Sequence, residues 1–360
     1  MSSHLFRYGR RKLSKALTFK ESRKLKEQEG CGEMDELMEA SSSEDEEALR
    51  RQETTESRSL QQGSNSSGAA ERRARSLSSG RLVAGASTQG DVCAQCTWRN
   101  GRHTDFKLRV GPKYSKNKRK AQSGPALYEQ IGMDVFRNTF DKVTKVSNIG
   151  NKVAFEEYEG ELDLGDSPAI PRIMIVNVQI PLGAPKMFGK SEPDAGISVV
   201  QYFEATEATL KEAQNMDTAS PALKLFSKFY QEAAFNDNMA RRFKMIGYVH
   251  NIAEVGVPAM LHSYNGKPAI VFKTGKTYQG PISGNAHDRY FEMDINVHDF
   301  AYVPRKALNS TLDKLPGMKI GSAYVIQGES DDELPETLLG CSDFEDLILS
   351  TAQDVVFGPE

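Results

Sequence analysis

The clearest β-strand pattern in the chain is Asp288-Arg-Tyr-Phe-Glu-Met-Asp-Ile-Asn-Val-His-Asp299. In it, every second side chain is apolar, in the order Phe291, Met293, Ile295 and Val297. The side chains between them are polar: Glu292, Asp294, Asn296 and His298. A period of two residues is typical of a β-strand with one buried and one polar face. We therefore expect a strand whose acidic side chains lie on the solvated face of a sheet.

Two further strands and a tight turn are expected close to this one in the sequence. Pro268–Lys273 and Ala323–Gln327 are short apolar runs that favour strands. Asn265-Gly266 is a residue pair that favours a two-residue hairpin turn. We therefore expect this turn to join Val257–His262 to Pro268–Lys273 as antiparallel neighbours.

The segment Glu333–Gly340 predicts one or two helical turns. Pro335 suits the first position of a helix, where its missing N–H has no cost. Gly340 suits the left-handed residue that often follows the end of a helix.

Strand and helix patterns are interspersed in the rest of the chain from residue 92. The other runs that favour strands include Phe106–Val110, Arg172–Pro181, Gly196–Phe203 and Arg241–Val249. Helices are expected at Thr206–Asn215 and after Ser220-Pro221, where the serine hydroxyl can cap the helix. Together these patterns predict an α+β fold, a single domain over residues 92–357 with a largely antiparallel sheet and flanking helices, preceded by a disordered N-terminal tail.

The composition is that of a globular chain without a membrane span. The chain has 360 residues, of which 38% are hydrophobic and 26% are charged, and its formal net charge is −3. Four cysteines are too few for a disulfide framework, so a reducing compartment is expected. No run approaches the ~18–20 apolar residues that a membrane span requires, and no apolar segment follows the basic start as in a secretory signal. These features predict a cytoplasmic location, which includes a peripheral position on a membrane.

Residues 1–90 are polar and arranged in blocks of charge, which predicts a disordered tail. Arg7–Lys26 is basic, and three interpretations stay open: a disordered arm, a segment that contacts anionic lipid, or an organelle transit peptide. Serines that precede an acidic run or follow arginines are candidate phosphorylation sites: Ser41, Ser43, Ser76 and Ser78. Phosphate on the last two would cancel part of the local positive charge.

The main electrostatic feature of the expected domain is a basic loop between Gly111 and Ala121. Its basic residues are Lys113, Lys116, Lys118, Arg119 and Lys120. A second basic group opens a predicted strand and consists of Arg241, Arg242 and Lys244. Clustered cations attract headgroup phosphates and anionic bilayers. No signature of a DNA- or RNA-binding module accompanies them, so we expect no nucleic acid partner. A solvated hairpin tip without a ligand is the alternative.

No motif indicates a metal site or a cofactor. Cys93 and Cys96 form a C-x-x-C close to His103, which suggests zinc. A structural zinc site needs four ligands, normally with a second closely spaced pair. The other two cysteines are single and distant, so we expect no metal and no cofactor.

No catalytic residue is predicted either. The sequence lacks a nucleophile motif, a phosphate-binding loop and metal-ligand spacing. Glu292, Asp294 and His298 share one face of the first strand and could supply acid–base groups, so an uncharacterised enzyme is a third hypothesis. Asn177 and Gln179 alternate with apolar residues in the same way, and we expect a sheet or a loop to satisfy their amides.

A series of short motifs runs through residues 92–357. They are Cys96-Thr-Trp98, Pro125-Ala-Leu-Tyr128 after the basic loop, Val176-Asn-Val-Gln-Ile-Pro181, Arg242-Phe-Lys-Met-Ile246, Lys267-Pro-Ala269, Tyr290-Phe-Glu-Met-Asp-Ile295, Ala323-Tyr-Val-Ile-Gln-Gly328 and Glu333-Leu-Pro-Glu336. In this order they resemble the C-terminal domain of the plant enhanced disease resistance 2 protein family, over nearly all of the expected domain.

The resemblance implies a role in lipid- or membrane-linked regulation. The parent protein of that family carries pleckstrin-homology and lipid-transfer domains ahead of this region, where the present chain has its polar tail. The chain also has additional residues around Glu204–Ser220. The first hypothesis is therefore a non-enzymatic regulatory module that binds an anionic lipid, such as a phosphoinositide, or a membrane surface. The alternative is a protein-interaction module controlled by phosphorylation of the tail.

Overall fold

A computed structural model describes residues 74–75, 87–88 and 97–356, except 139–145, 156–157, 159, 166–167, 187–194, 272–274 and 283. The chain divides into two compact units, residues 1–67 and 68–360, and every described residue lies in the second. The predicted tail, residues 1–90, therefore lies outside the described residues except for two dipeptides. These dipeptides are short strands at the edges of two sheets.

The larger sheet has seven strands in the order β11-β12-β7-β8-β6-β15-β2. Their bounds are β11 Gly275–Ile282, β12 Asn285–Asn296, β7 Ile173–Pro181, β8 Gly196–Ala205, β6 Tyr128–Asn138, β15 Gln353–Val356 and β2 Ser87–Thr88. β12 pairs with β7 and β15 with β6 in parallel, and the other neighbours are antiparallel. The alternating stretch Asp288–Asp299 forms most of β12, which pairs with the edge strand β11 on one side and with β7 on the other, and it ends in the 3₁₀ helix η6.

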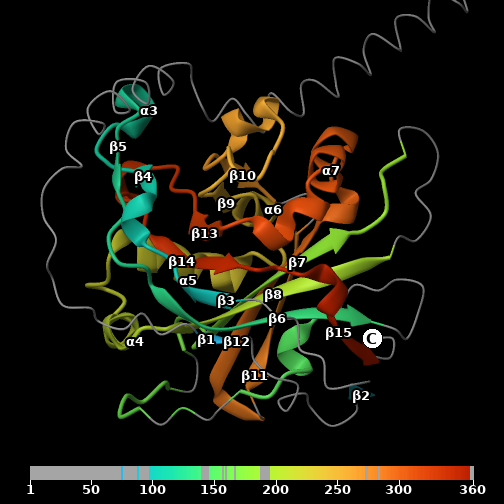
Figure 1. Ribbon diagram of the computed structural model, residues 1–360. Coiled ribbons are helices and arrows are strands. Elements are labelled where there is room, and N and C mark those ends of the chain that lie inside the picture. Colours follow the sequence, from blue (N-terminus) through green and yellow to red (C-terminus); the bar gives the residue numbers. More distant parts are fainter. Residues whose placement is uncertain are drawn as a thin grey trace, which may run out of the picture. The chain divides into compact units, whose positions relative to one another are not determined.

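The second sheet has six antiparallel strands in the order β1-β3-β14-β13-β9-β10. Their bounds are β1 Ala74–Arg75, β3 Thr97–Asn100, β14 Leu338–Glu345, β13 Ile320–Ile326, β9 Phe243–Val249 and β10 Pro268–Ile270. A separate antiparallel pair is formed by β4 Lys107–Arg109 and β5 Lys120–Gln122. Figure 1 shows how the red and gold strands of the six-stranded sheet lie above the green and yellow strands of the larger one.

Helices are short and connect the strands. The α-helices are α3 Tyr114–Asn117, α4 Glu207–Ala213, α5 Pro221–Glu232, α6 Asp237–Ala240 and α7 Tyr302–Asn309. The 3₁₀ helices are η2 His103–Asp105, η3 Ile149–Asn151, η4 Ala259–Tyr264, η6 Val297–Asp299, η7 Leu312–Gly317, η8 Asp331–Glu333 and η9 Leu349–Thr351. α5 begins as its sequence predicts, because the Ser220 side chain accepts a hydrogen bond from the Leu223 N–H and Pro221 holds the first position. Mostly antiparallel sheets with a few helices confirm the α+β fold.

Aromatic rings form the centre of the core where the two sheets meet. Phe203 of β8 packs edge to face on Tyr324 of β13, with ring centroids 5.8 Å apart. Tyr324 stacks on Phe243 of β9 at 5.9 Å, and Phe243 stacks on Phe229 of α5 at the same distance. Phe229 then meets Phe291 of β12 at 5.7 Å. All five rings are buried, so this cluster joins both sheets and α5.

The outer face of each sheet is covered by a segment of its own. On the seven-stranded sheet, Val146, Ile149 and Val153 pack over β7, β8 and β12. On the six-stranded sheet, Phe106 and Leu108 from the β4 region pack over β9, β13 and β14. Phe106 and Leu108 are buried, as the predicted strand at Phe106–Val110 requires.

The helix predicted at Glu333–Gly340 is wrong. Residues 331–333 form η8, and the chain enters β14 at Leu338. β14 pairs with β13 on one side and β3 on the other, and its Leu338 and Leu339 are buried. Pairing on both sides and burial outweigh the weak local preference of this segment for a helix.

The strand pair predicted around Asn265-Gly266 is also wrong. Ala259–Tyr264 forms the 3₁₀ helix η4, and β10 pairs instead with β9, Pro268 opposite Ile246. Gly266 does lie in a turn, with φ of 74°, and its N–H donates to the Gly247 carbonyl at 2.9 Å. Asn265-Gly266 therefore does form a turn, but the strand that pairs with β10 is β9, which lies earlier in the chain than Val257–His262.

We expect Gly340→Ala to destabilise the fold. A Cβ on Gly340 would lie 2.7 Å from Phe203 Cδ1, so the added methyl group would push the two sheets apart. Overpacking of this kind costs about 1–3 kcal/mol. Urea unfolding of the full chain measures this loss.

Gly247→Ala in β9 of the same sheet is the matched control, because nothing lies within 4 Å of a Cβ built there. We expect Gly247→Ala to leave the free energy of unfolding unchanged or slightly raised. Equal losses from both substitutions would show that the Phe203 contact does not limit the packing.

Candidate functional site

The predicted basic loop connects β4 to β5 and contains the single helical turn α3. Its side chains Lys113, Lys116, Lys118 and Arg119 are exposed, whereas Lys120 is half-buried. The structure thus brings the predicted cations together on one short loop, which we call the α3 loop (residues 111–120).

Hydrogen bonds fix the backbone of the α3 loop. The Lys113 N–H donates to Asp331 Oδ1 at 2.7 Å and ties the loop to η8. Within the loop, Asn117 Nδ2 donates to the Pro112 carbonyl at 3.1 Å, and the Arg119 N–H donates to Asn117 Oδ1 at 2.9 Å. The loop therefore presents its cations from a defined backbone rather than from a free chain.

The aromatic ring of Tyr114 contacts two cations, Arg109 of β4 and Lys118 of the α3 loop. The Arg109 guanidinium lies over the ring at 4.8 Å from its centroid, and Lys118 Nζ lies at 5.7 Å. Contacts of this kind stabilise a cation by about 0.5–1 kcal/mol when exposed to water. Neither Tyr114 nor Arg109 was among the predicted site residues, because the sequence does not show that the Arg109 side chain of β4 reaches the ring of Tyr114.

Lys244 of the second basic group lies beneath the α3 loop and not on the surface. It is 4% exposed, and its pKa is lowered to about 8, first by burial and then by Arg109, with Lys120 also lowering it. Glu336 opposes this shift and accepts hydrogen bonds from the N–H groups of Arg109 at 3.2 Å and Gly328 at 3.0 Å. Burial raises the pKa of Glu336, while Arg109, these N–H groups and Lys244 lower it. Lys244 therefore lies in the buried layer that supports the loop, close to Arg109, Glu336 and Lys120.

Arg242 is engaged in ion pairs. Its Nη1 lies 2.8 Å from Glu333 Oε1 and its Nη2 lies 2.7 Å from Glu329 Oε2. Arg241 beside it is exposed. The motif Glu333–Glu336 thus has a structural role: Glu333 binds Arg242, and Glu336 anchors the base of the α3 loop.

The carboxylates of β12 are buried, so the prediction of a solvated face is wrong. Glu292 is 0% exposed and Asp294 is 2% exposed. Glu292 Oε1 and Oε2 accept hydrogen bonds from the N–H groups of Ile149 and Gly150, both at 2.9 Å. Burial first, and then the neighbouring Asp294 carboxylate, raise the pKa of Glu292 well above its usual value, although the two N–H groups lower it. Residues 146–155 cover this face, which the alternation of β12 alone does not indicate.

Asp294 and the neighbouring amides form one network under the same segment. Asn177 Nδ2 donates to Asp294 Oδ1 at 2.8 Å, and Gln179 Nε2 donates to Asp294 Oδ2 at 3.1 Å. Both amide nitrogens also donate to the Val146 carbonyl at 2.8 Å, so a loop satisfies the NH₂ groups as predicted, whereas the buried Oδ1 of Asn177 has no hydrogen-bond partner among the described residues. His298, the third predicted acid–base group, lies in η6 against Gly196.

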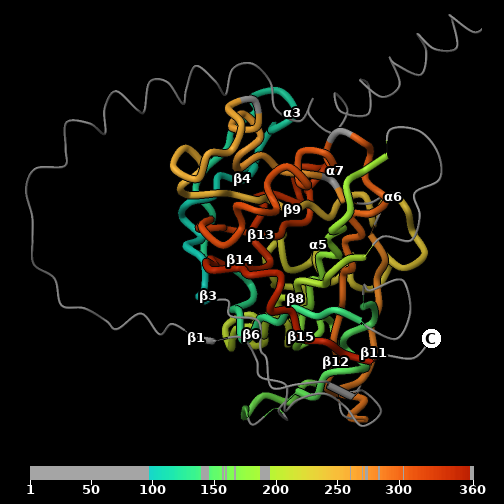
Figure 2. The backbone as a smooth tube through the Cα atoms, turned by 45° about the vertical axis from the view of Figure 1, so that its right-hand side comes forward, coloured from blue at the N-terminus to red at the C-terminus, as the bar shows by residue number. Residues whose placement is uncertain are grey.

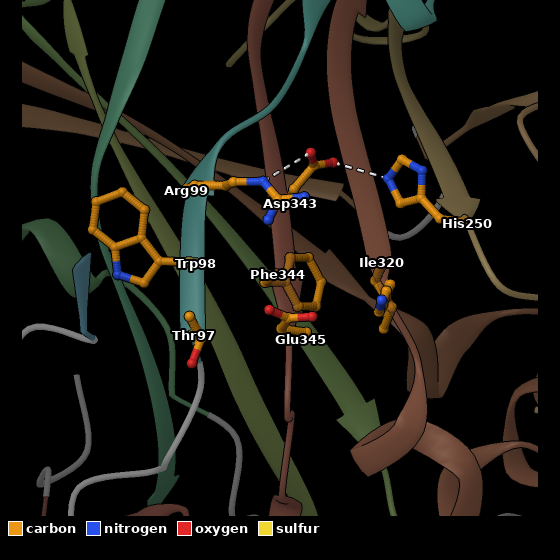
Figure 3. Close-up of a pocket in the computed structure, with 9 residues that line it drawn as sticks. Thr97, Trp98, Arg99, His250, Ile320, Asp343, Phe344 and Glu345 are labelled. Carbon is orange, nitrogen blue, oxygen red and sulfur yellow. Dashed lines mark hydrogen bonds and ion pairs between the residues drawn. The ribbon is translucent and has the colours of Figure 1, made fainter. Parts of the chain in front are cut away.

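A shallow pocket lies on the outer face of the six-stranded sheet (Figure 3). Asp343 Oδ2 lies 3.5 Å from Arg99 Nε, and Asp343 Oδ1 lies 3.0 Å from His250 Nε2. Gly321 makes room for these contacts, because a Cβ there would lie 3.2 Å from both Asp343 Oδ1 and His250 Nε2. Asp343 already has two partners in the pocket, so we assign no ligand to it.

Several predicted residues lie outside the described residues. These are the candidate phosphorylation sites Ser41, Ser43, Ser76 and Ser78 and the pair Cys93 and Cys96. His103 is described, and its Nδ1 lies 2.9 Å from the Ser123 carbonyl oxygen. Within the described ranges, no three His, Cys, Asp or Glu side chains are grouped to hold a metal ion. None of the described helices has the length and hydropathy needed to cross a bilayer.

We expect Lys244 to make the fold more stable as the pH rises above 8. Its pKa is about 8 in the folded protein and 10.5 in an ordinary lysine, so between these values the unfolded chain binds more protons. The free energy of unfolding therefore gains up to about 3 kcal/mol from this group across that range. Lys244→Met removes the gain.

Urea unfolding of the parent chain and of Lys244→Met on either side of this pH range measures the effect. The difference in stability should shift in favour of the parent chain as the pH rises. A difference that is the same on both sides would mean that the charged form of Lys244 is not penalised in the folded protein.

Comparison with known proteins assigns most of the chain to one protein family. A family model described as Protein ENHANCED DISEASE RESISTANCE 2, C-terminal, matches residues 98–347. The match spans more than half of the chain and runs from β3 to the residues after β14. Searches of the curated proteins and of the solved structures gave no match. The chain therefore belongs to the family of the C-terminal domain of the enhanced disease resistance 2 protein.

Proposed function

We propose that the domain is a non-enzymatic regulatory module that binds the surface of an anionic membrane through the α3 loop. The observation that supports this most directly is the exposure of Lys113, Lys116, Lys118 and Arg119 on one fixed loop. The sequence from Phe106 to Tyr128 contains no aspartate or glutamate, so the acid that offsets part of this charge comes from η8, where the Asp331 carboxylate accepts the Lys113 N–H. Four cations close together favour a surface of many phosphates over a single carboxylate partner.

The fixed backbone strengthens the proposal. A mobile arm loses conformational entropy when it orders on a surface, whereas the α3 loop is already held by Asp331 and Asn117. The buried Lys244 and the half-buried Lys120 add positive potential beneath the loop, and Glu336 partly compensates for it. The loop therefore has the charge and the rigidity that a peripheral membrane contact requires.

No catalytic function is proposed. The acid–base groups that an enzyme would use, Glu292 and Asp294, have their oxygens engaged by N–H groups of the chain. This arrangement supports a structural role, in which Glu292 holds Ile149 and Gly150 on the sheet and Asp294 binds the two amides that donate to the Val146 carbonyl.

We expect the triple variant Lys116→Glu, Lys118→Glu, Arg119→Glu to bind anionic vesicles far more weakly than the parent chain. Each cation near such a surface contributes roughly 1 kcal/mol, so removal of three lowers the partition coefficient by about 100-fold or more. Co-sedimentation of the full chain with phosphatidylcholine vesicles, with and without phosphatidylserine or a phosphoinositide, measures this at low and high salt.

Two further variants serve as controls. Lys211→Glu, Lys224→Glu, Lys228→Glu makes the same change in net charge at exposed lysines of α4 and α5 and should bind like the parent chain. Arg10→Glu, Arg11→Glu, Lys12→Glu tests the basic arm at the start of the chain. If only the arm variant loses binding, the α3 loop is not the membrane contact. If the parent chain does not bind, a protein partner controlled by tail phosphorylation becomes the leading hypothesis.

A further inference from the structure

We propose that the membrane-facing end of the domain has a second component, in which Tyr264 of η4 inserts its ring into the bilayer interface beside the α3 loop. This inference rests on the proposed function and names a second contact for it. The loop would supply attraction to anionic headgroups, and Tyr264 would supply an apolar contact that persists at high salt.

Position is the first observation. In Figures 1 and 2, which differ by a rotation about the vertical axis, α3 and the gold segment between β9 and β10 both lie at the upper end of the described domain. That segment contains η4. A flat surface that meets the α3 loop at this end can therefore also meet η4.

Exposed aromatic rings are the second observation. In the described part of the chain, the large hydrophobic side chains with high exposure are Phe235 at 78%, Tyr248 at 38% and Tyr264 at 38%. Tyr264 ends η4, and Tyr248 lies against the turn at Gly266 that follows it. Two of these three rings thus belong to the same corner of the domain. Pro258 and Ala259 at the start of η4 are exposed as well and add apolar surface.

Charge is the third observation. Val255 to His287 contains no aspartate or glutamate, although the chain has 49 acidic residues. The segment does contain Lys267, which follows Tyr264 closely in sequence. An acid-free segment with an exposed tyrosine and a lysine can approach anionic lipid without repulsion.

The turn after Tyr264 is rigid, which allows the ring to be presented in a defined position. Asn265 Oδ1 accepts a hydrogen bond from the Val249 N–H at 2.7 Å, and Asn265 Nδ2 donates to the Val249 carbonyl at 3.1 Å. The Gly266 N–H donates to the Gly247 carbonyl at 2.9 Å. The end of η4 is therefore fastened to β9, and a substitution at the exposed Tyr264 leaves these bonds in place.

The test uses Tyr264→Trp in the full chain and vesicles of phosphatidylcholine and phosphatidylserine whose acyl chains carry bromine, which quenches nearby indole fluorescence. We expect the fluorescence added by this substitution to be quenched on binding. The single natural tryptophan, Trp98, is 6% exposed in the core, and the parent chain gives its background. Phe235→Trp is the matched control: Phe235 directly precedes the N-cap residue of α6, which Figure 2 places to the right of and below both α3 and the gold segment, and we expect no quenching there.

A second measurement separates this contact from the electrostatic one. Tyr264→Ser should weaken vesicle binding roughly threefold to tenfold at high salt, where the contribution of the α3 loop is screened. Binding of Tyr264→Trp without quenching, together with unchanged binding of Tyr264→Ser, would overturn this inference and leave the proposed function intact. Absence of binding by the parent chain would overturn both.

Discussion

Packing of Phe203 against Tyr324 joins the two sheets, and the arrangement of the other elements depends on this contact. The two rings meet edge to face at 5.8 Å, and Gly340 lies against Phe203 without a side chain that would hold the sheets apart. Stacking of Tyr324 on Phe243 and of Phe243 on Phe229 extends the contact to α5. Because protein interiors are densely packed, this cluster fixes both sheets relative to each other. Each sheet then has one outer face that other segments must cover.

Both outer faces are covered in the same physical way. A buried carboxylate is unfavourable unless hydrogen bonds compensate for the loss of water. Glu292 receives them from the N–H groups of Ile149 and Gly150 and so holds the segment that covers the seven-stranded sheet. Glu336 receives them from Arg109 and Gly328 and so holds the base of the α3 loop on the six-stranded sheet. The base of the proposed membrane contact is thus held in place by the way in which the fold satisfies a buried acid, while Asp331 and Asn117 fix the backbone of the loop itself.

The candidate site could be predicted from the sequence only in part. A dense run of lysines after a short strand is exposed wherever the strand lies, because no core can accept so many charges, and Lys113, Lys116, Lys118 and Arg119 are indeed exposed. The same reasoning predicted that Lys244 is exposed, but Lys244 is buried because the β4–β5 pair covers the outer face of its strand. Tyr264 was not identified at all, because exposure of a single aromatic residue depends on what packs over it and leaves no periodic pattern.

Local patterns in the sequence were sufficient to predict the strands β7, β8, β9 and β12, the start of α5 at Ser220-Pro221, and the basic character of the α3 loop. These features depend on side chains close together along the chain, whose periodicity and local hydrogen bonds are readable without a fold. The tertiary structure decided that Leu338–Glu345 is a strand, that β10 pairs with β9, and that Glu292 and Asp294 are buried. Each of these depends on a partner far along the chain. Residues 146–150 reach Glu292 only because the sheet brings them together, and the free energy of that contact outweighs any local preference.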